Sequence, residues 1–181
     1  AGWEGAANFK ALCGGEALPR DLGASLSGRC GELWNLYGPT ETTVWSSLYR
    51  VRPEAVQVLI GTPIANTTIY ILDKSGNPVP AGIPGEIFIG GAGVARGYLN
   101  RAELTAERFI ADPFAASADA RMYRTGDQWR YLVDGNLEYR SRLDSQVKIR
   151  GYRIELGEIE HTLLSIDGIR RAVVVPREDQ P

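Results

Sequence analysis

Residues 35–43 read NLYGPTETT, and this stretch indicates how the first part of the chain folds. A short, largely apolar run typical of a strand enters a Gly-Pro turn, and the turn leads to hydroxyls and a carboxylate. Glycine lets a ligand approach the backbone closely, and proline stiffens the turn. Threonine hydroxyls and free backbone N–H groups suit phosphate oxygens, and the Glu41 carboxylate suits a hard cation such as Mg²⁺. A plain strand-to-helix turn with a capping threonine is the alternative interpretation of Gly-Pro-Thr alone.

A similar unit precedes this one. Residues 9–13, apolar except for Lys10, run into a Gly-Gly step, and residues 19–27 between the two units are compatible with a helix. Two strands joined through a helix are typical of an α/β arrangement. We therefore expect an α/β layer over about the first 60 residues.

The middle of the chain is rich in turn residues. Glycine (21 residues) and proline (10 residues) are concentrated between positions 61 and 97, where short apolar runs alternate with turns. This pattern predicts strands at 67–72, 86–89 and 97–99. Asp134-Gly135, flanked by the strand-like segments 131–133 and 137–139, is a strong hairpin signal. A β-barrel is expected here.

The last third begins with alternating apolar and polar residues at 146–154, which predicts a strand. Residues 158–165 carry apolar side chains at helical spacing, and 172–175 is again strand-like. The order strand, helix, strand indicates a small α+β unit. The fold class expected for the whole chain is thus α/β plus β-barrel plus α+β.

Composition excludes several classes of protein. The 181 residues carry 20 Lys and Arg against 22 Asp and Glu, a formal charge of -2, which argues against a general nucleic-acid binder. The apolar runs are too short to cross a bilayer. Two cysteines, Cys13 and Cys30, are too few for a disulfide framework and favour a reducing cytoplasm. The single histidine, His161, excludes a Cys/His zinc cluster and Ser-His-Asp chemistry. Because the chain opens at Ala1 and stops just after a strand-like run, we expect a fragment of a longer protein.

Two further stretches carry polar residues suited to chemistry. Residues 123–127 read YRTGD, and Asp127 after a glycine turn can accept two hydrogen bonds from a ribose diol. An exposed aspartate on a turn is the alternative. In residues 142–151, RLDSQVKIRG, the polar step at Asp144 is a candidate hinge between strands, and Arg142 is placed to reach a ribose or phosphate. A solvated basic strand edge is the alternative there.

These stretches occur together in an order that resembles the adenylation domain of nonribosomal peptide synthetases, in the adenylate-forming superfamily of acyl-CoA synthetases and luciferases. The similar motifs are GGEAL at 14–18, NLYGPTE at 35–41, the glycine-rich segment at 85–99, YRTGD at 123–127 and RLDSQVKIRGYRIELGE at 142–158. The resemblance covers essentially the whole chain. It implies the C-terminal part of the large subdomain and the first half of the small C-terminal subdomain. The expected parts are 1–60, the end of the α/β large subdomain with the nucleotide motif; 61–143, a distorted β-barrel; and 144–181, the hinge and the start of the small α+β subdomain.

The resemblance implies a reaction in two steps. An amino acid reacts with ATP and Mg²⁺ to form aminoacyl-AMP, which then passes to the phosphopantetheine of a carrier protein. The family's roles fall on these residues: Gly15, Glu16, Ala17, Asn35, Tyr37 and Gly38 around the nucleotide; Thr40 at the α-phosphate; Glu41 at Mg²⁺; Asp127 and Arg142 at the ribose; Asp144 as the hinge; Lys148 and Gly151 at the thiol tunnel. Thr40, Glu41, Asp127 and Arg142 are the expected catalytic residues. The family's phosphate loop and catalytic lysine match nothing in the chain, so the isolated chain is predicted to be inactive.

Five positions resemble the family's amino-acid pocket: Leu12, Gly14, Leu36, Val44 and Trp45. Bulky apolar groups leave little room beyond Cα, and a charged substrate side chain would remain unpaired at a cost of several kcal/mol. The series is similar to the family's glycine signature, which predicts glycine, with alanine or another small residue second. The alternative is that Trp45 is a packed core aromatic.

Residues 106–114, AERFIADPF, resemble the surface where MbtH-like proteins dock on such domains, which implies an MbtH-like partner. The alternative is a helix and loop that seal the barrel with Phe109 and Phe114. Two other functions remain open from the sequence: a free-standing amino-acid or aryl-acid adenylating ligase, and a non-catalytic interaction module.

Overall fold

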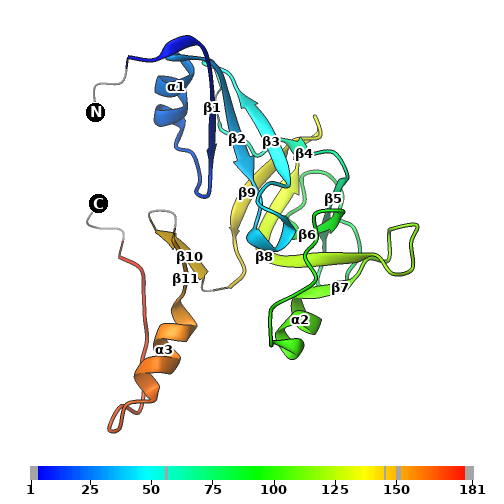
Figure 1. Ribbon diagram of the computed structural model, residues 1–181, viewed down its shortest axis with the longest axis vertical. Coiled ribbons are helices and arrows are strands. Elements are labelled where there is room, and N and C mark those ends of the chain that lie inside the picture. The colour runs from blue at the N-terminus through cyan, green and yellow to red at the C-terminus, as the bar shows by residue number, and fades with distance from the viewer. Residues whose placement is uncertain (1–3, 56, 145, 150–151, 178–181) are drawn as a thin grey trace.

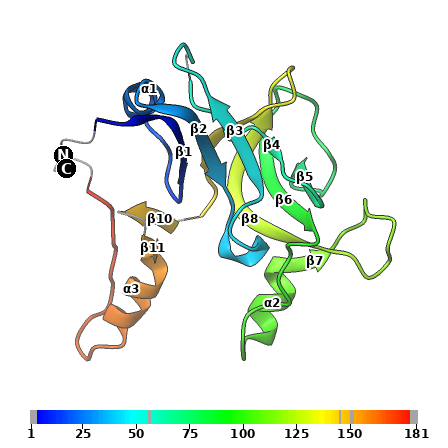
Figure 2. The same ribbon diagram turned by 45° about the horizontal axis from the view of Figure 1, so that its top comes forward.

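A computed structural model describes residues 4–55, 57–144, 146–149 and 152–177. In these residues the strands form three sheets, and Figure 1 shows the first two side by side with the third set apart to the left of β8. The third carries the last helix, which points away from the body of the molecule (Figure 1, Figure 2).

The first sheet contains four strands in the order β1 (Ala6–Gly14), β2 (Cys30–Tyr37), β3 (Ser47–Val51) and β4 (Thr62–Pro63). β1 and β2 are parallel and are joined through α1 (Arg20–Ser27), since parallel neighbours need a crossover connection. β3 and β4 run antiparallel to their neighbours. The predicted helix at 19–27 and the two flanking strands are confirmed.

The second sheet contains β5 (Thr67–Leu72), β6 (Gly85–Gly91), β8 (Arg121–Tyr131) and β7 (Phe109–Ala111) in that spatial order, and β9 (Leu137–Arg142) also pairs with β8. All these pairs are antiparallel. The predicted hairpin at Asp134-Gly135 joins β8 to β9. Residues 97–99 are not a strand; they lie in the turn that leads to α2 (Ala102–Arg108), where Gly97 has a φ of +141°.

One apolar core joins the two sheets. It contains Tyr37 from β2 and Ile60 from the loop before β4, packed with residues of the second sheet: Ile69, Ile71, Ile87, Ile89, Trp129 and Leu137. Burial of this shared core fixes the end of β2 against the strands of the second sheet. The predicted site segments in these two sheets are therefore held on one rigid body.

The third sheet differs from its prediction. The alternating run at 146–154 is two short strands, β10 (Gln146–Ile149) and β11 (Tyr152–Glu155), which pair antiparallel. Paired residues such as Val147 and Ile154 share a face but differ in parity, so the apolar residues change from odd to even positions between the two strands, a change that the single-strand prediction overlooked. α3 (Leu156–Leu164) follows as predicted and carries an exposed His161. The predicted strand at 172–175 is wrong: the Val174 N–H donates to Glu160 of α3 at 2.9 Å instead of to a strand.

Gly61 lies where the two sheets meet. Its surroundings predict that substitution at this position strongly destabilises the fold. Its φ is +72°, and an added Cβ would stand 1.8 Å from the Leu48 carbonyl oxygen. Gly61→Ala should lower the free energy of unfolding by more than about 3 kcal/mol, measured by urea denaturation. Gly135→Ala is the matched control, because Gly135 has a φ of +82° with no atom within 4 Å of the added Cβ, and about 1–2 kcal/mol is expected there. Equal losses would contradict the close approach of Gly61 to the backbone of β3.

Candidate functional site

A cavity of about 560 Å³ opens where the ends of β1 and β2 meet β8, β9 and β10. This volume lies in the range of small-molecule sites. The predicted nucleotide residues that line it are Gly15, Glu16, Ala17, Asn35, Tyr37, Gly38, Asp127 and Arg142. A smaller cavity of about 160 Å³ shares several of these walls and adds Thr40, Tyr123 and Arg153. The structure thus brings together segments that are far apart in the sequence.

Asp127 is the buried anion of this cavity, with an exposed fraction of 6%. The Tyr37 hydroxyl donates to one carboxylate oxygen at 2.6 Å, and Arg142 Nη1 donates to the other at 2.7 Å. Burial raises the pKa of Asp127 above its usual range, although the arginine opposes this effect. Burial likewise raises the pKa of Tyr37 well above its usual value, so the phenol stays protonated and remains a donor. The exposed turn considered as the alternative for Asp127 is therefore wrong.

A local irregularity in β8 aims Asp127 into the cavity. The pairing of β6 with β8 shifts register between Glu86 and Phe88, opposite residues 125–127, as in a β-bulge. Thr125 Oγ1 donates to the Ile87 carbonyl and accepts the Asp127 N–H. Gly126 has a φ of +76°, a conformation that favours glycine.

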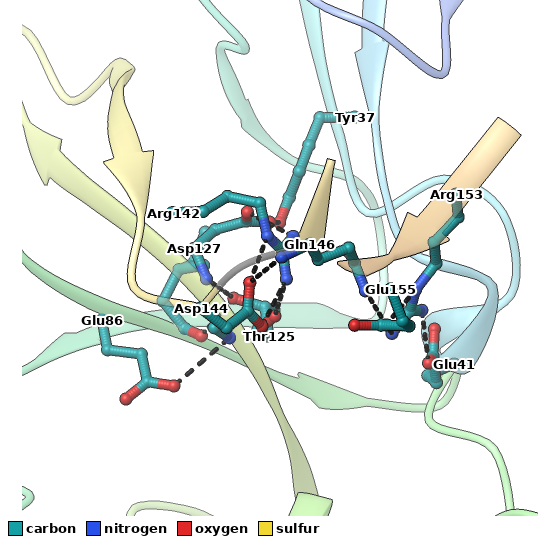
Figure 3. A network of polar contacts seen from close by, with 12 residues as sticks. Tyr37, Glu41, Glu86, Thr125, Asp127, Arg142, Asp144, Gln146, Arg153 and Glu155 are labelled. Carbon is teal, nitrogen blue, oxygen red and sulfur yellow. Dashed lines mark hydrogen bonds and ion pairs between the residues drawn. The ribbon is translucent and has the colours of Figure 1, made fainter. Parts of the chain in front are cut away.

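Arg142 links the cavity to the predicted hinge. Its Nε and Nη2 bind the two oxygens of Asp144 at 2.7 and 2.8 Å, in the forked geometry typical of strong arginine–carboxylate pairs. The same guanidinium binds Asp127 through Nη1 (Figure 3). An added Cβ on Gly126 would lie 2.6 Å from Asp144 Oδ2, so only glycine leaves room for this approach. The predicted ribose end and the predicted hinge are therefore one polar cluster.

Glu41 lies on the short 3₁₀ turn η1 (Thr40–Thr42) and is 6% exposed. Its Oε1 accepts hydrogen bonds from the Tyr98 hydroxyl at 2.6 Å and from Arg153 Nη1 at 2.7 Å. Burial alone would raise the pKa of Glu41, but these donors together bring it below its usual value. The other oxygen, Oε2, is buried and has no partner among the described residues. A carboxylate with one free oxygen is a suitable Mg²⁺ ligand.

The glycine-rich segment 85–99 supports η1 from one side. The Ala95 N–H donates to the Glu41 carbonyl at 2.9 Å, and the Thr43 hydroxyl donates to the Gly93 carbonyl at 2.8 Å. Thr43 and Val44 have φ values of 62° and 71°, which β-branched residues rarely adopt. Backbone strain of this kind occurs at functional sites, where the surrounding structure maintains it.

The five predicted pocket positions are only partly brought together. Gly14 on β1 pairs in register with Leu36 on β2, and an added Cβ on Gly14 would lie 2.4 Å from the Trp45 ring. Leu36 also lines the larger cavity. Leu12 and Val44 are 66% and 55% exposed. The half-buried Trp45 ring thus lies directly against Gly14, where any side chain would collide with it.

The remaining predictions have different outcomes. Lys148 lines both cavities, with its ammonium 5.9 Å from the centre of the Tyr37 ring, whereas Gly151 lies outside the described residues. In the segment resembling a partner surface, Phe109 is buried at 5% exposure and Phe114 contacts Tyr70. Phe109 is thus part of the core, as the alternative interpretation expects, whereas Phe114 stays 41% exposed.

Sequence reasoning missed two residues of the site, Tyr98 and Arg153. Tyr98 belongs to the glycine-rich segment, but its spacing from Glu41 gives no signal. Arg153 is 112 residues from Glu41, and in the sequence it is one of several basic residues on a strand-like run. Only the fold shows that both donate to the same carboxylate oxygen.

The sequence profile of AMP-binding enzymes matches residues 6–99. The chain belongs to this family. A linear gramicidin synthase of Brevibacillus parabrevis is 56% identical over 169 residues, which cover 93% of this chain and 2% of that protein. The dimodular nonribosomal peptide synthase of Bacillus subtilis (strain 168) is 52% identical over 174 residues, covering 96% of this chain and 7% of that protein.

Two solved structures extend the comparison. A four-domain nonribosomal peptide synthetase, holo-AB3403, crystallised with AMP and glycine, is 52% identical with a TM-score of 0.74, covering 97% of this chain and 13% of that one. Holo-PA1221 contains adenylation and PCP domains and is bound to a vinylsulfonamide inhibitor. It is 35% identical with a TM-score of 0.83, and the match covers 93% of this chain and 30% of that one. The family and fold predicted from the sequence are confirmed. The chain spans only a small share of the length of these relatives.

Two negative findings concern the described part of the chain. None of its helices is long and apolar enough to cross a membrane. Nor do three or more His, Cys, Asp or Glu residues gather there as a metal site.

The Tyr37 hydroxyl gives a test of the buried cluster. Tyr37→Phe should lower the free energy of unfolding by about 1.5–3 kcal/mol, because it leaves an oxygen of the buried Asp127 carboxylate without its donor. Tyr131→Phe is the matched control, since that hydroxyl donates at 2.9 Å to the Ile69 carbonyl, and about 0.5–1.5 kcal/mol is expected. Urea denaturation measures both. A loss for Tyr37→Phe no larger than the control's would contradict a charged acceptor at Asp127.

Proposed function

We propose that this chain supplies the nucleotide-binding and hinge parts of an amino-acid-activating adenylation domain of a nonribosomal peptide synthetase. The parent domain forms aminoacyl-AMP from ATP and an amino acid and loads it onto the phosphopantetheine of a carrier protein. The observation that carries the proposal is Asp127, whose buried carboxylate is held by Tyr37 and Arg142 at the wall of a ligand-sized cavity. The isolated chain is expected to be inactive, because no residue of it matches the family's phosphate loop or catalytic lysine.

The two cavities divide the nucleotide between them in this proposal. The adenine occupies the larger one, against the Tyr37 ring, which Trp129 fixes at a centroid distance of 4.8 Å. Gly15 to Ala17 border the base, and the ribose hydroxyls donate to Asp127. The α-phosphate lies in the smaller cavity beside Thr40. Arg142 keeps the Asp127 carboxylate in place and ionised while the ribose binds.

Glu41 would hold Mg²⁺, and its buried oxygen without a partner supports this assignment. The ion supplies charge neutralisation at the phosphate oxygens. Tyr98 positions the carboxylate by binding its other oxygen. Water would complete the metal's shell together with the nucleotide.

Glycine is the proposed amino acid. The Trp45 ring lies against Gly14 beside Leu36, which supports a small apolar pocket. The similar synthetase structure with bound glycine agrees with this choice. Rejection of alanine by one methyl group provides only ~1–3 kcal/mol, so weak alanine activity is expected.

The carrier protein approaches from the side of Lys148 and Gly151, with Asp144 as the hinge between the two steps of the reaction. A similar solved protein contains an adenylation and a PCP domain, which supports a carrier as the partner. An MbtH-like protein on residues 106–114 stays part of the proposal. Cys13 and Cys30 are both free thiols, which supports a cytoplasmic location.

ATP–pyrophosphate exchange with all twenty amino acids, on the adenylation domain that contains this chain, tests the proposal. Glycine should give the highest rate and alanine a lower one. Trp45→Ala should raise the ratio of leucine to glycine exchange at least about tenfold, because the indole no longer fills the pocket. The ratio separates a change of selectivity from a general loss of stability.

A maximum with a charged or aromatic amino acid would contradict the glycine assignment while leaving the family intact. No exchange with any amino acid, with an MbtH-like protein added, would contradict amino-acid activation. An aryl acid giving exchange in that case would indicate a free-standing aryl-acid ligase.

A further inference from the structure

The ion pair between Arg153 and Glu41 connects two parts of the molecule across the predicted hinge. Arg153 lies on β11, beyond Asp144, and Glu41 lies on η1 in the body, and their N–O distance is 2.7 Å (Figure 3). Apart from α3, no described helix or strand packs extensively against the β10–β11 hairpin. Side-chain contacts of this kind therefore hold the hairpin against the body.

With Arg153 docked, neither oxygen of Glu41 is open to a hydrated ion. Oε1 already accepts from Tyr98 and Arg153, and Oε2 is shielded from solvent. Mg²⁺ retains several water molecules when it binds a protein carboxylate. A hydrated ion cannot reach Oε2 in this arrangement, and a second cation on the same carboxylate would repel the guanidinium.

Arg153 has another partner when it leaves Glu41. Its Nε and Nη2 each lie 3.3 Å from Glu155 Oε1 on the same strand. Gln146 on β10 also donates to that carboxylate. Tyr98 belongs to the body and stays on Glu41. Undocking of the hairpin thus leaves neither the arginine nor the glutamate without a partner, and it frees one coordination position on Glu41.

We propose that Glu41 is an exclusive site for one of two cations: Arg153 when the hairpin is docked, and Mg²⁺ when it is not. This inference rests on the proposed function, in which Glu41 holds the metal. Metal and docked hairpin then oppose one another, and by linkage each weakens the other by the same factor. When Mg²⁺ leaves with pyrophosphate after aminoacyl-AMP has formed, Arg153 can dock on Glu41. Docking of the hairpin would then follow directly from completion of the first step.

The experiment measures the position of the small subdomain directly. Spin labels are placed at Lys74→Cys, in the exposed turn after β5, and at Asp167→Cys, exposed after α3, in an adenylation domain with Cys13 and Cys30 replaced by serine. Pulsed electron paramagnetic resonance gives the label distance over a MgCl₂ titration at constant ionic strength. The docked distance should lose population as Mg²⁺ rises. Arg153→Gln should lack most of the docked population before any Mg²⁺ is added.

A second measurement uses Mn²⁺ as the probe, with AMP present. The concentration of free Mn²⁺ gives the affinity of the domain for the ion. Arg153→Gln should bind Mn²⁺ about fivefold or more tightly than the unsubstituted domain, because the competing cation is gone. Arg50→Gln is the matched control: it removes the same charge from β3, where Arg50 pairs with Glu32 at 3.6 Å. Both of its readouts should equal those of the unsubstituted domain.

A docked population that Mg²⁺ does not change would overturn the inference, and so would equal Mn²⁺ affinity with and without Arg153. These failures differ from failure of the proposed function, which would appear as absence of AMP binding and of pyrophosphate exchange. Competition between Arg153 and Mg²⁺ for Glu41 can therefore be rejected in a domain whose activity is intact.

Discussion

The guanidinium of Arg142 is the interaction on which the rest of the site depends. It binds Asp127 at the wall of the cavity and Asp144 at the predicted hinge, through nitrogens of one planar group. Two carboxylates so close together would repel each other, and the shared cation removes that penalty. The Asp127 pair is nearly buried, so loss of the arginine would leave an uncompensated charge, at a cost of several kcal/mol.

The backbone around this cluster is arranged to permit it. Gly126 leaves space for Asp144, the bulge in β8 aims Asp127 into the cavity, and the shared apolar core holds Tyr37 against the same carboxylate. At the other end of the site, the glycine-rich loop supports Glu41 in a similar way. Both carboxylates are thus fixed by donors before any ligand arrives, which lowers the entropy lost on binding.

Local pattern was enough to predict much of the fold. The apolar run into Gly38-Pro39 and the Asp134-Gly135 hairpin are specified by nearby residues, and the structure has both. The division of 146–154 into two strands was missed, although the apolar residues change from odd positions (Val147, Ile149) to even ones (Tyr152, Ile154), as two paired antiparallel strands require. The predicted strand at 172–175 was wrong, because a strand needs a neighbouring strand to accept its N–H groups, and the Val174 N–H donates to Glu160 instead.

The candidate site, too, could be predicted only where short sequence motifs specify it. Motif resemblance placed Asp127, Arg142 and Glu41, whereas Tyr98 and Arg153 act through contacts over 57 and 112 residues, which no periodicity or composition encodes.

In the proposed site, Asp127 accepts the hydroxyls of a nucleotide ribose. The most direct test compares the affinities of the adenylation domain for AMP and for 2′,3′-dideoxy-AMP by calorimetry. This contact predicts at least about tenfold weaker binding of the dideoxy form, since hydrogen bonds to a charged group contribute ~1.5–3 kcal/mol. Asp127→Asn should remove most of that difference. Equal affinities for both nucleotides in the unsubstituted domain would contradict the role of Asp127.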